Sequence, residues 1–391
     1  MRRETPIRHR AVLIGDSVYR LHTYGKNHPL GIPRVSLAMD VIESYGALQD
    51  DEYLASRKAS PEELEWFHTK DYVSAVKKCE ELGKIPKGYR ARYNLGGFEN
   101  PWFEGIFSTP GLACGASIQG AEQVLSGTMA FNPAGGMHHA MPDKARGFCF
   151  FNDVVLGILR LRKEGLKVLY LDMDAHHCDG VEYAFRRDPM VVTVSVHMDT
   201  NFAYPFRGGS IEDVGPVANA VNLPLPKGVN DSEYRAVFSA LWPAVLAAVR
   251  PDVVVLQSGT DVLFSDPLGK FELSTQLVNE MQSLVVELSP RKPDGTPRLL
   301  VVGGGGYHPL ALARCWAGLW GVMTGRSLPE KLPDEAVQVL RDVAWDDDED
   351  EPYYASFFEQ RIDEPREGPV RQDVLDRMST LFRTHPLLKV M

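Results

Sequence analysis

Cysteine is scarce in this chain of 391 residues. The five cysteines lie far apart and form no Cys-x-x-Cys pair: Cys79, Cys114, Cys149, Cys178 and Cys315. An odd number of widely spaced cysteines argues against a disulfide framework and against a zinc site built from thiolates. We therefore expect reduced thiols and a cytoplasmic protein.

Long hydrophobic runs and an excess of positive charge are also missing. The most apolar stretch, Val237–Val249, is too short to span a bilayer and contains Pro243, and no signal-peptide pattern follows the basic residues near Met1. The formal net charge is −10, whereas proteins that bind nucleic acid need a basic surface. We expect no membrane span and no direct contact with nucleic acid.

Six short runs are hydrophobic without alternation, which is typical of parallel strands covered on both faces. They are Ala11–Asp16, Thr128–Gly136, Lys167–Asp174, Val191–His197, Val253–Gly259 and Leu299–Tyr307. Helical patterns lie between them, for example at Asn152–Glu164, Ser232–Val249 and Leu273–Leu288. The alternation of strands and helices predicts an α/β fold with a parallel sheet between helices.

The chain shows no internal repeat and no linker rich in proline and serine. We therefore expect one domain over residues 1–391, with a core at about 11–325 and polar helices at about 330–391 packed on it. The acidic run Asp346–Glu351 is typical of a solvated patch without a specific role.

Polar residues stand at the ends of five of the predicted strands or just beyond them. They are His138 and His139, then Asp172, Asp174 and His176, then Ser195 and His197, and finally Asp261 and Tyr307. Ligands of open α/β sheets bind at the carboxyl ends of the strands, which meet at one edge of a parallel sheet. The sequence therefore predicts a polar site at that edge.

Asp174, His176 and Asp261 form the candidate metal site. Because alternate residues of a strand point to the same side, Asp174 and His176 can reach one ion together, and Asp261 can add a third ligand. Two carboxylates and one imidazole leave coordination positions open, as catalytic sites do. This donor set suits Zn²⁺ and also Fe²⁺ or Mn²⁺, so the sequence leaves the metal open.

The adjacent histidines His138 and His139 follow two glycines. Buried imidazoles need partners that fix their tautomer and raise their basicity. Asp172 and Asp179 are spare carboxylates beside the metal ligands, and each can hold one imidazole. We predict two differently charged imidazoles that move protons for a metal-activated water.

The segment Gly303–Gly306 lets the backbone approach a ligand closely. It is not a phosphate-binding loop, because no Lys-Ser or Lys-Thr pair follows it. Tyr307 comes directly after the glycines and can donate a hydrogen bond to a carbonyl that becomes an oxyanion.

At this point the sequence strongly resembles the zinc-dependent histone deacetylase superfamily, and most of all its bacterial deacetylase-like and acetoin-utilisation members. The matching segments run in family order from Tyr24 to Trp316: "YGKNHPLGIPRVSL", "FHTKDYV", "FNPAGGMHHAMPDKARGFCFFND", "LDMDAHHCDGVEYAF", "VSVH", "SGTDVLFSDPL" and "VVGGGGYHPLALARCW". The resemblance implies the arginase/deacetylase fold, a single α/β domain with a mainly parallel sheet of eight strands.

The resemblance also implies roles for the residues singled out above. The catalytic residues would be His138 paired with Asp172, His139 paired with Asp179, and Tyr307, and the zinc ligands would be Asp174, His176 and Asp261. Tyr307 would polarise the scissile amide carbonyl together with the metal.

A narrow tunnel for the acyl-lysine stem is implied as well. Its residues would be Phe148, Tyr204, Gly147, Gly305 and Glu99. The family usually has phenylalanine where Tyr204 stands, so the wall is more polar here. Glu99 stands where many relatives carry an aspartate that grips the substrate backbone. Arg34 matches an arginine near the exit for acetate.

The family also binds structural potassium, and the resemblance implies two sites. One would use Asp172, Asp174, His176, Ser195 and Val196, several of them through backbone carbonyls, and the other would lie near Phe185, Asp188 and Val191.

The function implied is a metal-dependent amidohydrolase that removes acetyl or other acyl groups from lysine side chains and releases acetate. The partner would be an acetylated lysine of a protein substrate. Acetylpolyamines, other small acyl-amines and longer acyl-lysines stay open as substrates. Neither the physiological substrate nor the oligomeric state follows from the sequence.

Two other functions fit the sequence less well. A two-manganese ureohydrolase needs Asp-Ala-His-x-Asp, but Cys178 stands at the fifth position, and it needs Asp-x-Asp where Asp261 is followed by Val262 and Leu263. A non-catalytic acyl-lysine binding module is expected to lose a ligand, the histidine pair or the tyrosine, and this chain keeps all of them.

Overall fold

The centre of the molecule is an eight-stranded sheet in the order β2-β1-β3-β8-β7-β4-β5-β6. The computed structural model describes residues 10–21, 24–25, 27–345 and 352–389, and every strand pairing within them is parallel. The strands are β1 (Ala11–Gly15), β2 (Tyr53–Ala55), β3 (Met129–Asn132), β4 (Val168–Asp172), β5 (Val191–Met198), β6 (Ala220–Leu225), β7 (Val253–Gln257) and β8 (Leu299–Val302). The predicted α/β class and eight-stranded sheet are confirmed.

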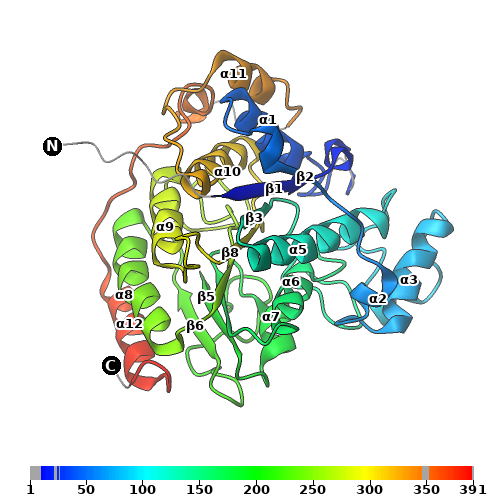
Figure 1. The fold of residues 1–391 in the computed structure, drawn as a ribbon, viewed down its shortest axis with the longest axis horizontal. Coiled ribbons are helices and arrows are strands. Elements are labelled where there is room, and N and C mark those ends of the chain that lie inside the picture. Colours follow the sequence, from blue (N-terminus) through cyan, green and yellow to red (C-terminus); the bar gives the residue numbers. More distant parts are fainter. Residues whose placement is uncertain (1–9, 22–23, 26, 346–351, 390–391) are drawn as a thin grey trace.

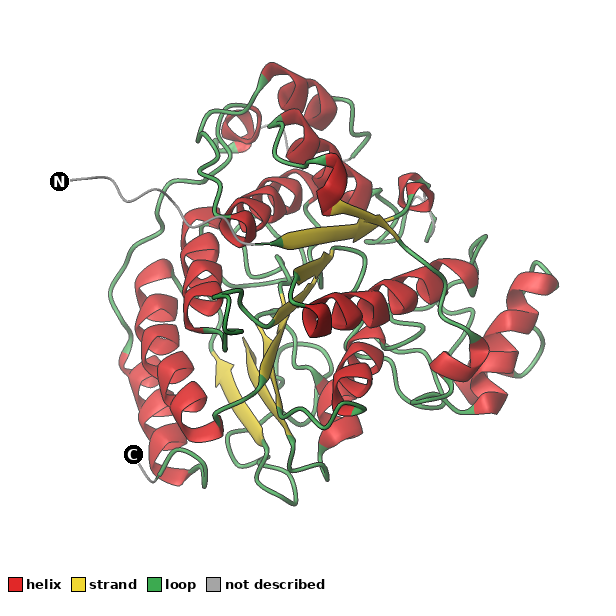
Figure 2. Ribbon diagram, viewed as in Figure 1, coloured by secondary structure: helices red, strands yellow, loops and turns green. Residues whose placement is uncertain are grey.

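Helices flank the sheet on both sides (Figures 1 and 2). On one side lie α5 (Ser108–Ser126), α6 (Asp153–Arg162) and α7 (Asp179–Phe185), and on the other lie α1 (Arg34–Ser44), α8 (Asp231–Val249), α9 (Thr275–Leu288), α10 (Pro309–Thr324) and α12 (Gln372–Thr384). The remaining helices are α2 (Pro61–Leu64), α3 (Lys70–Glu81), α4 (Tyr89–Tyr93) and α11 (Asp334–Arg341), with short 3₁₀ turns η1 (Ser17–Arg20), η2 (Asp50–Glu52) and η3 (Tyr354–Phe358).

The strands bury both of their faces, which explains their unbroken hydrophobicity. Along β4, Leu169 and Leu171 belong to the hydrophobic cluster that includes α8, α9 and α10, whereas Val168 and Tyr170 belong to the cluster that includes α5 and α6. Successive side chains of a strand point to opposite faces, so each helical layer receives its own apolar row.

Side-chain caps fix where the predicted helices begin. Helix α6 starts at Asp153 because the Asn152 side chain accepts a hydrogen bond from the backbone N–H of Val155. Ser274 caps α9 in the same way, so this helix starts later than the predicted Leu273. Asparagine and serine at these positions satisfy N–H groups that have no partner within the helix.

Several predicted strands are shorter in the structure. β3, β4 and β8 end at Asn132, Asp172 and Val302, and the polar and glycine residues that follow them form loops. Two strands were not predicted, β2 and β6. Both lie at the edges of the sheet; β2 has three residues, and β6 contains Pro224, a residue that weakens a strand signal.

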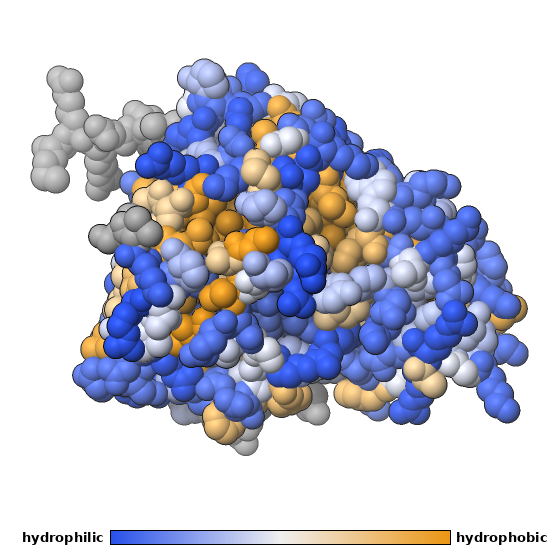
Figure 3. Space-filling view, turned by 90° about the horizontal axis from the view of Figure 1, so that it is seen from below, coloured by the Kyte–Doolittle hydropathy of each residue, from blue (hydrophilic) through white to orange (hydrophobic). Residues whose placement is uncertain are grey.

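The C-terminal helices pack on the main body. Helix α12 contacts β6 and α8, and α11 contacts α1. The acidic run Asp346–Glu351 lies outside the described residues. No helix within the described ranges is long and apolar enough to cross a membrane. The face seen from below is mainly hydrophilic at its periphery, with hydrophobic side chains gathered nearer its middle (Figure 3).

Candidate active site

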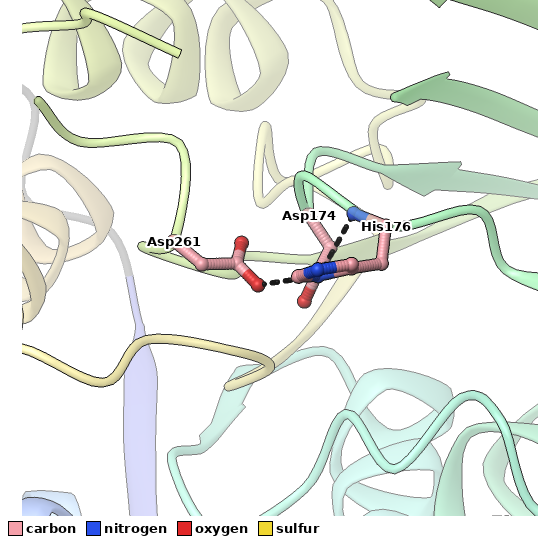
Figure 4. Close-up of side chains that lie close together, drawn as sticks. All are labelled: Asp174, His176 and Asp261. Carbon is pink, nitrogen blue, oxygen red and sulfur yellow. Dashed lines mark hydrogen bonds and ion pairs between the residues drawn. The ribbon is translucent and has the colours of Figure 1, made fainter. Parts of the chain in front are cut away.

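Asp174, His176 and Asp261 lie together in the loops that follow β4 and β7 (Figure 4). One ligand atom from each residue lies within 4.8 Å of the other two, and all three residues are buried. The Nδ1 atom of His176 is 2.9 Å from Asp261 Oδ2 and 3.1 Å from Asp174 Oδ1. The structure thus brings together the three residues predicted as metal ligands.

Asp174 and His176 come together through loop turns and not through the strand alternation that the sequence suggested. Because β4 ends at Asp172, Asp174 and His176 lie in a loop, and strand alternation does not align them. Instead, Asp172 Oδ1 accepts a hydrogen bond from the backbone N–H of Asp174, and Asp174 Oδ1 accepts one from the backbone N–H of His176. Two successive aspartate turns therefore shape the loop.

The electrostatics of these residues suit a divalent cation. Burial raises the pKa of the Asp261 carboxyl, and the negative charge of Asp174 raises it further. Two carboxylates buried this close together destabilise each other unless a positive charge lies between them. The donor set of two carboxylate oxygens and one imidazole fits Zn²⁺ or Fe²⁺.

His138 and His139 lie next to this group, and each is backed by its own carboxylate. The Nδ1 atom of His138 is 2.7 Å from Asp172 Oδ2, and the Nδ1 atom of His139 is 2.7 Å from Asp179 Oδ1. Both pairings match those expected from the sequence. The two Nε2 atoms are 3.0 Å apart, so the two rings share one proton between them.

The two imidazoles differ in basicity. Burial acts to lower the pKa of His138, but the charges of Asp172 and Asp174 outweigh it and raise this pKa to about 9. Burial and the nearby charge of His138 lower the pKa of His139 to about 4. Near neutral pH the pair therefore consists of a charged His138 and a neutral His139.

Tyr307 stands at the end of the glycine segment and lines the same cavities as His139 and His176. Its backbone N–H donates to Asp266 Oδ2 at 2.7 Å, which anchors the loop. Burial raises the pKa of the Tyr307 hydroxyl well above its usual value, so this group stays protonated and able to donate.

Gly305 passes directly over the metal-ligand group. Its backbone N–H donates to Asp174 Oδ2 at 2.7 Å. A Cβ atom at Gly305 would lie 2.1 Å from Asp261 Oδ2 and 2.8 Å from Asp174 Oδ2. No other residue type fits this approach without moving the carboxylates, which explains why glycine is needed here.

A cavity of about 300 Å³ leads to these groups from the surface. Phe148, Tyr204 and Gly147 line it, as predicted for a tunnel, together with His139 and Tyr307. Gly147 has a positive φ of 53°, and a Cβ atom there would lie 2.4 Å from the His139 ring. The small residue therefore allows the wall to close against the imidazole.

Glu99 also lines this cavity, but its carboxylate already has partners within the chain. Its Oε1 accepts hydrogen bonds from the backbone N–H of Gly147 at 2.5 Å and from the Tyr204 hydroxyl at 2.9 Å. Its Oε2 accepts one from the Asn94 side chain at 3.0 Å. The Glu99 carboxylate thus bonds to two residues that line the cavity, Gly147 and Tyr204, and to Asn94.

Arg34 lies on the inner side of the site. Its guanidinium donates to the carbonyls of Gly304 and Gly306 at 2.7 and 3.1 Å. It also lines a second cavity of about 80 Å³, together with Tyr24 and Met137. The residue expected at an acetate exit thus stands between the glycine loop and a second, smaller cavity.

The structure gives the two sets of residues expected around potassium different surroundings. Asp172 and Ser195 of the first set are paired in register across β4 and β5. The backbone carbonyls of Phe185, Asp188 and Val191, the second set, also lie together, but they surround the side chain of Asn219.

Three supporting residues were not predicted from the sequence. Gln257 Nε2 donates to Asp174 Oδ2 at 2.7 Å, Asp266 anchors the Tyr307 backbone, and Asp153 Oδ1 accepts from the N–H of Met137, just before the histidine pair. Asp266 and Asp153 lie inside matching segments quoted above, so those segments held a signal for them. A glutamine at the end of a strand carries no comparable signal.

Comparisons with known proteins agree with this geometry. The chain matches the family described as Histone deacetylase domain over residues 28–323. It is 37% identical over 306 residues to Histone deacetylase 8 of Xenopus tropicalis, covering 77% of this chain and 80% of that protein. It is 32% identical over 330 residues to the acetoin utilization protein AcuC of Bacillus subtilis, covering 82% and 84%.

Solved structures give the same result. The crystal structure of an HDAC homolog from Aquifex aeolicus superposes with a TM-score of 0.89 at 40% sequence identity, covering 95% of this chain and 99% of that one. A structure of an HDAC homolog complexed with SAHA matches with the same values. The chain therefore belongs to the histone deacetylase family.

Proposed function

We propose that the protein is a zinc-dependent deacetylase that hydrolyses the amide bond of acetylated lysine side chains and releases acetate. One observation carries the proposal. A single small cavity is lined by His138, His139, Asp174, His176 and Tyr307, so the histidine pair, two members of the metal-ligand group and the tyrosine face one space. All the groups needed for amide hydrolysis can reach the same bond there.

Asp174, His176 and Asp261 would hold the metal. When bound, a zinc ion would polarise the amide carbonyl and lower the pKa of water at the site. The Gln257 amide and the Gly305 N–H both donate to Asp174 Oδ2, which fixes the orientation of this carboxylate.

His139 is the proton acceptor in this proposal. Its Nδ1 is held by Asp179, so the lone pair of the neutral ring lies at Nε2, which is 3.0 Å from Nε2 of the charged His138, and the residue lines the cavity. A proton taken up at Nε2 can then be delivered to the leaving amine nitrogen. The charged His138 ring stabilises negative charge as it develops nearby.

The Tyr307 hydroxyl would donate a hydrogen bond to the carbonyl oxygen as it becomes an oxyanion. The Phe148 ring stands 5.9 Å from the Tyr307 ring in an edge-to-face arrangement, and the Tyr204 ring stands 4.7 Å from the His139 ring. These aromatic walls suit the apolar methylene stem of a lysine and keep water away from the reacting groups.

Glu99 acts as a brace of the tunnel in this proposal. It ties Tyr204, on one wall, to Gly147, which precedes Phe148 on the other. The hydroxyl that distinguishes Tyr204 from phenylalanine thereby gains a fixed partner. The three hydrogen bonds from its own chain fill three of the roughly four acceptor positions of the carboxylate and leave one, on Oε2, for a substrate N–H.

The charges at the mouth favour an acyl-lysine peptide over an acetylpolyamine. Lys227 and Lys270 line the cavity and are exposed. The acidic groups beside them are already engaged, because Asp199 pairs with Arg377 at 2.9 Å and Glu99 is held by the wall. A polycation is repelled by such a mouth, whereas a peptide with neutral or acidic flanking residues is not.

The remaining proposals concern the product, the ions and the location. The positive charge of Arg34 beside the cavity of about 80 Å³ suits a departing acetate ion. The first set of residues, with Asp172 and Ser195 paired, would bind structural K⁺. A cytoplasmic location is supported by the five cysteines, which are all free thiols.

A panel of substrates on the zinc-loaded protein tests the function. It contains acetyl-, propionyl-, butyryl- and longer acyl-lysine peptides together with acetylpolyamines, each measured with and without a hydroxamate chelator. We expect hydroxamate-sensitive release of acetate from the acetyl-lysine peptides. The H139A variant, which keeps the metal ligands, is expected to bind zinc but turn over at most about 1% as fast.

Other outcomes of the panel would overturn parts of the proposal. Faster turnover of acetylpolyamines would assign the protein to small acyl-amines. A preference for longer acyl chains would change the substrate but keep the mechanism. A folded, zinc-loaded protein that binds acyl-lysine peptides without cleaving any of them would be a binding module.

A further inference from the structure

Asn219 stands in the middle of the second set of residues expected to bind potassium. Its Nδ2 atom is 2.9 Å from the carbonyl oxygen of Phe185, 3.0 Å from that of Asp188 and 2.8 Å from that of Val191. Asn219 is 3% exposed, so water has little access to this cluster. One nitrogen atom thus occupies the point on which three backbone carbonyls converge.

Carbonyl oxygens that converge in this way can take the place of the water shell of K⁺. They cannot do so while another atom fills the centre. An amide nitrogen carries two protons, each with a partial positive charge, and it offers these to the same oxygens that would hold the ion. The residues present in this chain therefore do not fit a second potassium ion.

The orientation of the amide follows from its surroundings. Turned by 180°, the Asn219 side chain would bring Oδ1 against three carbonyl oxygens, and four partial negative charges would meet without a cation. In the orientation observed, Oδ1 is buried without a hydrogen-bond partner. Leaving Oδ1 without a partner is the smaller cost, because the turned amide would withdraw both of its N–H donors from the three carbonyls and set a fourth oxygen against them.

The backbone also brings Asn219 to this position against a local preference. Ala218, directly before it, has a positive φ of 55°, which is uncommon for a residue other than glycine. The Asn219 carbonyl accepts a hydrogen bond from the N–H of Thr193 on β5. Main chain and side chain together join the start of β6 to the turn between α7 and β5.

We propose that the side-chain amide of Asn219 replaces a monovalent cation at this position, so that the chain binds potassium at the first set of residues alone. The amide supplies positive charge to the same three carbonyls and holds the α7–β5 turn without an ion. This turn follows the helix that carries Asp179, the partner of His139. The proposal does not depend on the reaction that the protein catalyses.

Rubidium, whose anomalous scattering identifies it in a crystal, tests the proposal directly. The protein is freed of potassium in tetramethylammonium chloride, crystallised and soaked in RbCl. We expect no Rb⁺ peak among the carbonyls of Phe185, Asp188 and Val191 in the native chain. The N219A variant should show one there, because the substitution empties the centre and leaves the three oxygens.

Stability measured in solution gives a second readout. At constant ionic strength, replacing tetramethylammonium with K⁺ should raise the unfolding temperature of N219A more than that of the native protein. N222A is the matched control, because Asn222 is a buried amide in the adjoining strand β6 that bonds to Glu182 and to the Asp213 carbonyl instead. It should lose stability without gaining a larger response to K⁺.

Two results would overturn the proposal. One is a Rb⁺ peak among the three carbonyls of the native chain, with Asn219 turned away. The other is an N219A protein that shows neither the peak nor the added response to K⁺, since the carbonyls would then form no cation cage. If N219A fails to fold, N219D serves, because a carboxylate of the same shape among three carbonyls requires a cation and should bind Rb⁺.

Discussion

Tyr307 is the residue whose single hydroxyl separates binding from turnover most cleanly. It lines the cavity with His139 and His176 but is not among the predicted metal ligands. We expect Y307F to bind zinc normally and to lose roughly 100- to 1000-fold in kcat, the usual cost of one oxyanion donor. Turnover of an acetyl-lysine peptide and zinc content per chain measure the two effects.

A second tyrosine provides the control. The Tyr53 side chain is exposed on the edge strand β2 and lines neither of the cavities that Tyr307 lines, so Y53F removes the same atom away from the site. This variant should keep its native rate. A Y307F protein that also keeps at least half of the native rate would rule out the proposed role of the hydroxyl.

Which residues of the site could be predicted from the sequence depended on their chemical type. Asp174, His176 and Asp261 were predictable because carboxylates and imidazoles after buried strands have few other roles. Gln257, which orients Asp174, was not predictable, because an amide at a strand end is common in any sheet. The three partners of Glu99 were also hidden, since they come from segments that meet only in the folded chain.

The glycine segment Gly303–Gly306 is the element whose backbone must approach the carboxylates of the metal-ligand group closely. Gly305 leaves no room for a Cβ atom beside Asp261 and Asp174. We expect G305A to fold but to lose zinc affinity by about 10- to 100-fold, because the added methyl displaces a carboxylate. Zinc titration with a competing chelator measures the affinity.

G97A is the matched control for this substitution. A Cβ atom at Gly97 would meet nothing nearer than 3.7 Å, from the side chain of Arg90. Zinc affinity should therefore stay at the native value. If G305A bound zinc as tightly as G97A, the close approach of this loop would not be needed for the site.

Strands and loops differed in how far they could be predicted. The inner strands β4, β7 and β8 were predictable, because burial on both faces leaves a continuous apolar run. The edge strands β2 and β6 were not, because they lack that run. The apolar pattern extends the predicted strands into the loops after β4 and β8. After β4, hydrophobicity alone does not show that turns of Asp172 and Asp174 redirect the chain.

The stability of the whole molecule should depend on one buried carboxyl outside the site. Burial raises the pKa of Glu182 on α7 from its ordinary value of 4.5 to about 7, although the Asn222 amide opposes the shift. The folded state therefore holds this proton more tightly than the unfolded state. The protonated Glu182 carboxyl therefore adds to the free energy of unfolding. This contribution is fully present below pH 4.5 and is lost as pH rises through about 7.

The E182Q variant removes this dependence, because a neutral amide never has to ionise in the interior. The difference in unfolding free energy between E182Q and the native chain should shift by roughly 3 kcal/mol in favour of the variant between pH 4.5 and about 7, and should then stay constant. Urea unfolding at several pH values and fixed salt measures this difference.

E233Q is the comparison variant, and we expect it to be less stable than the native chain at neutral pH. Burial acts to raise the pKa of Glu233, but the ion pair with Arg371, at 2.6 Å, outweighs it and lowers this pKa. Equal pH profiles for E182Q and the native chain would mean that Glu182 is solvated in the folded protein and that its carboxyl does not hold its proton more tightly there than in the unfolded chain.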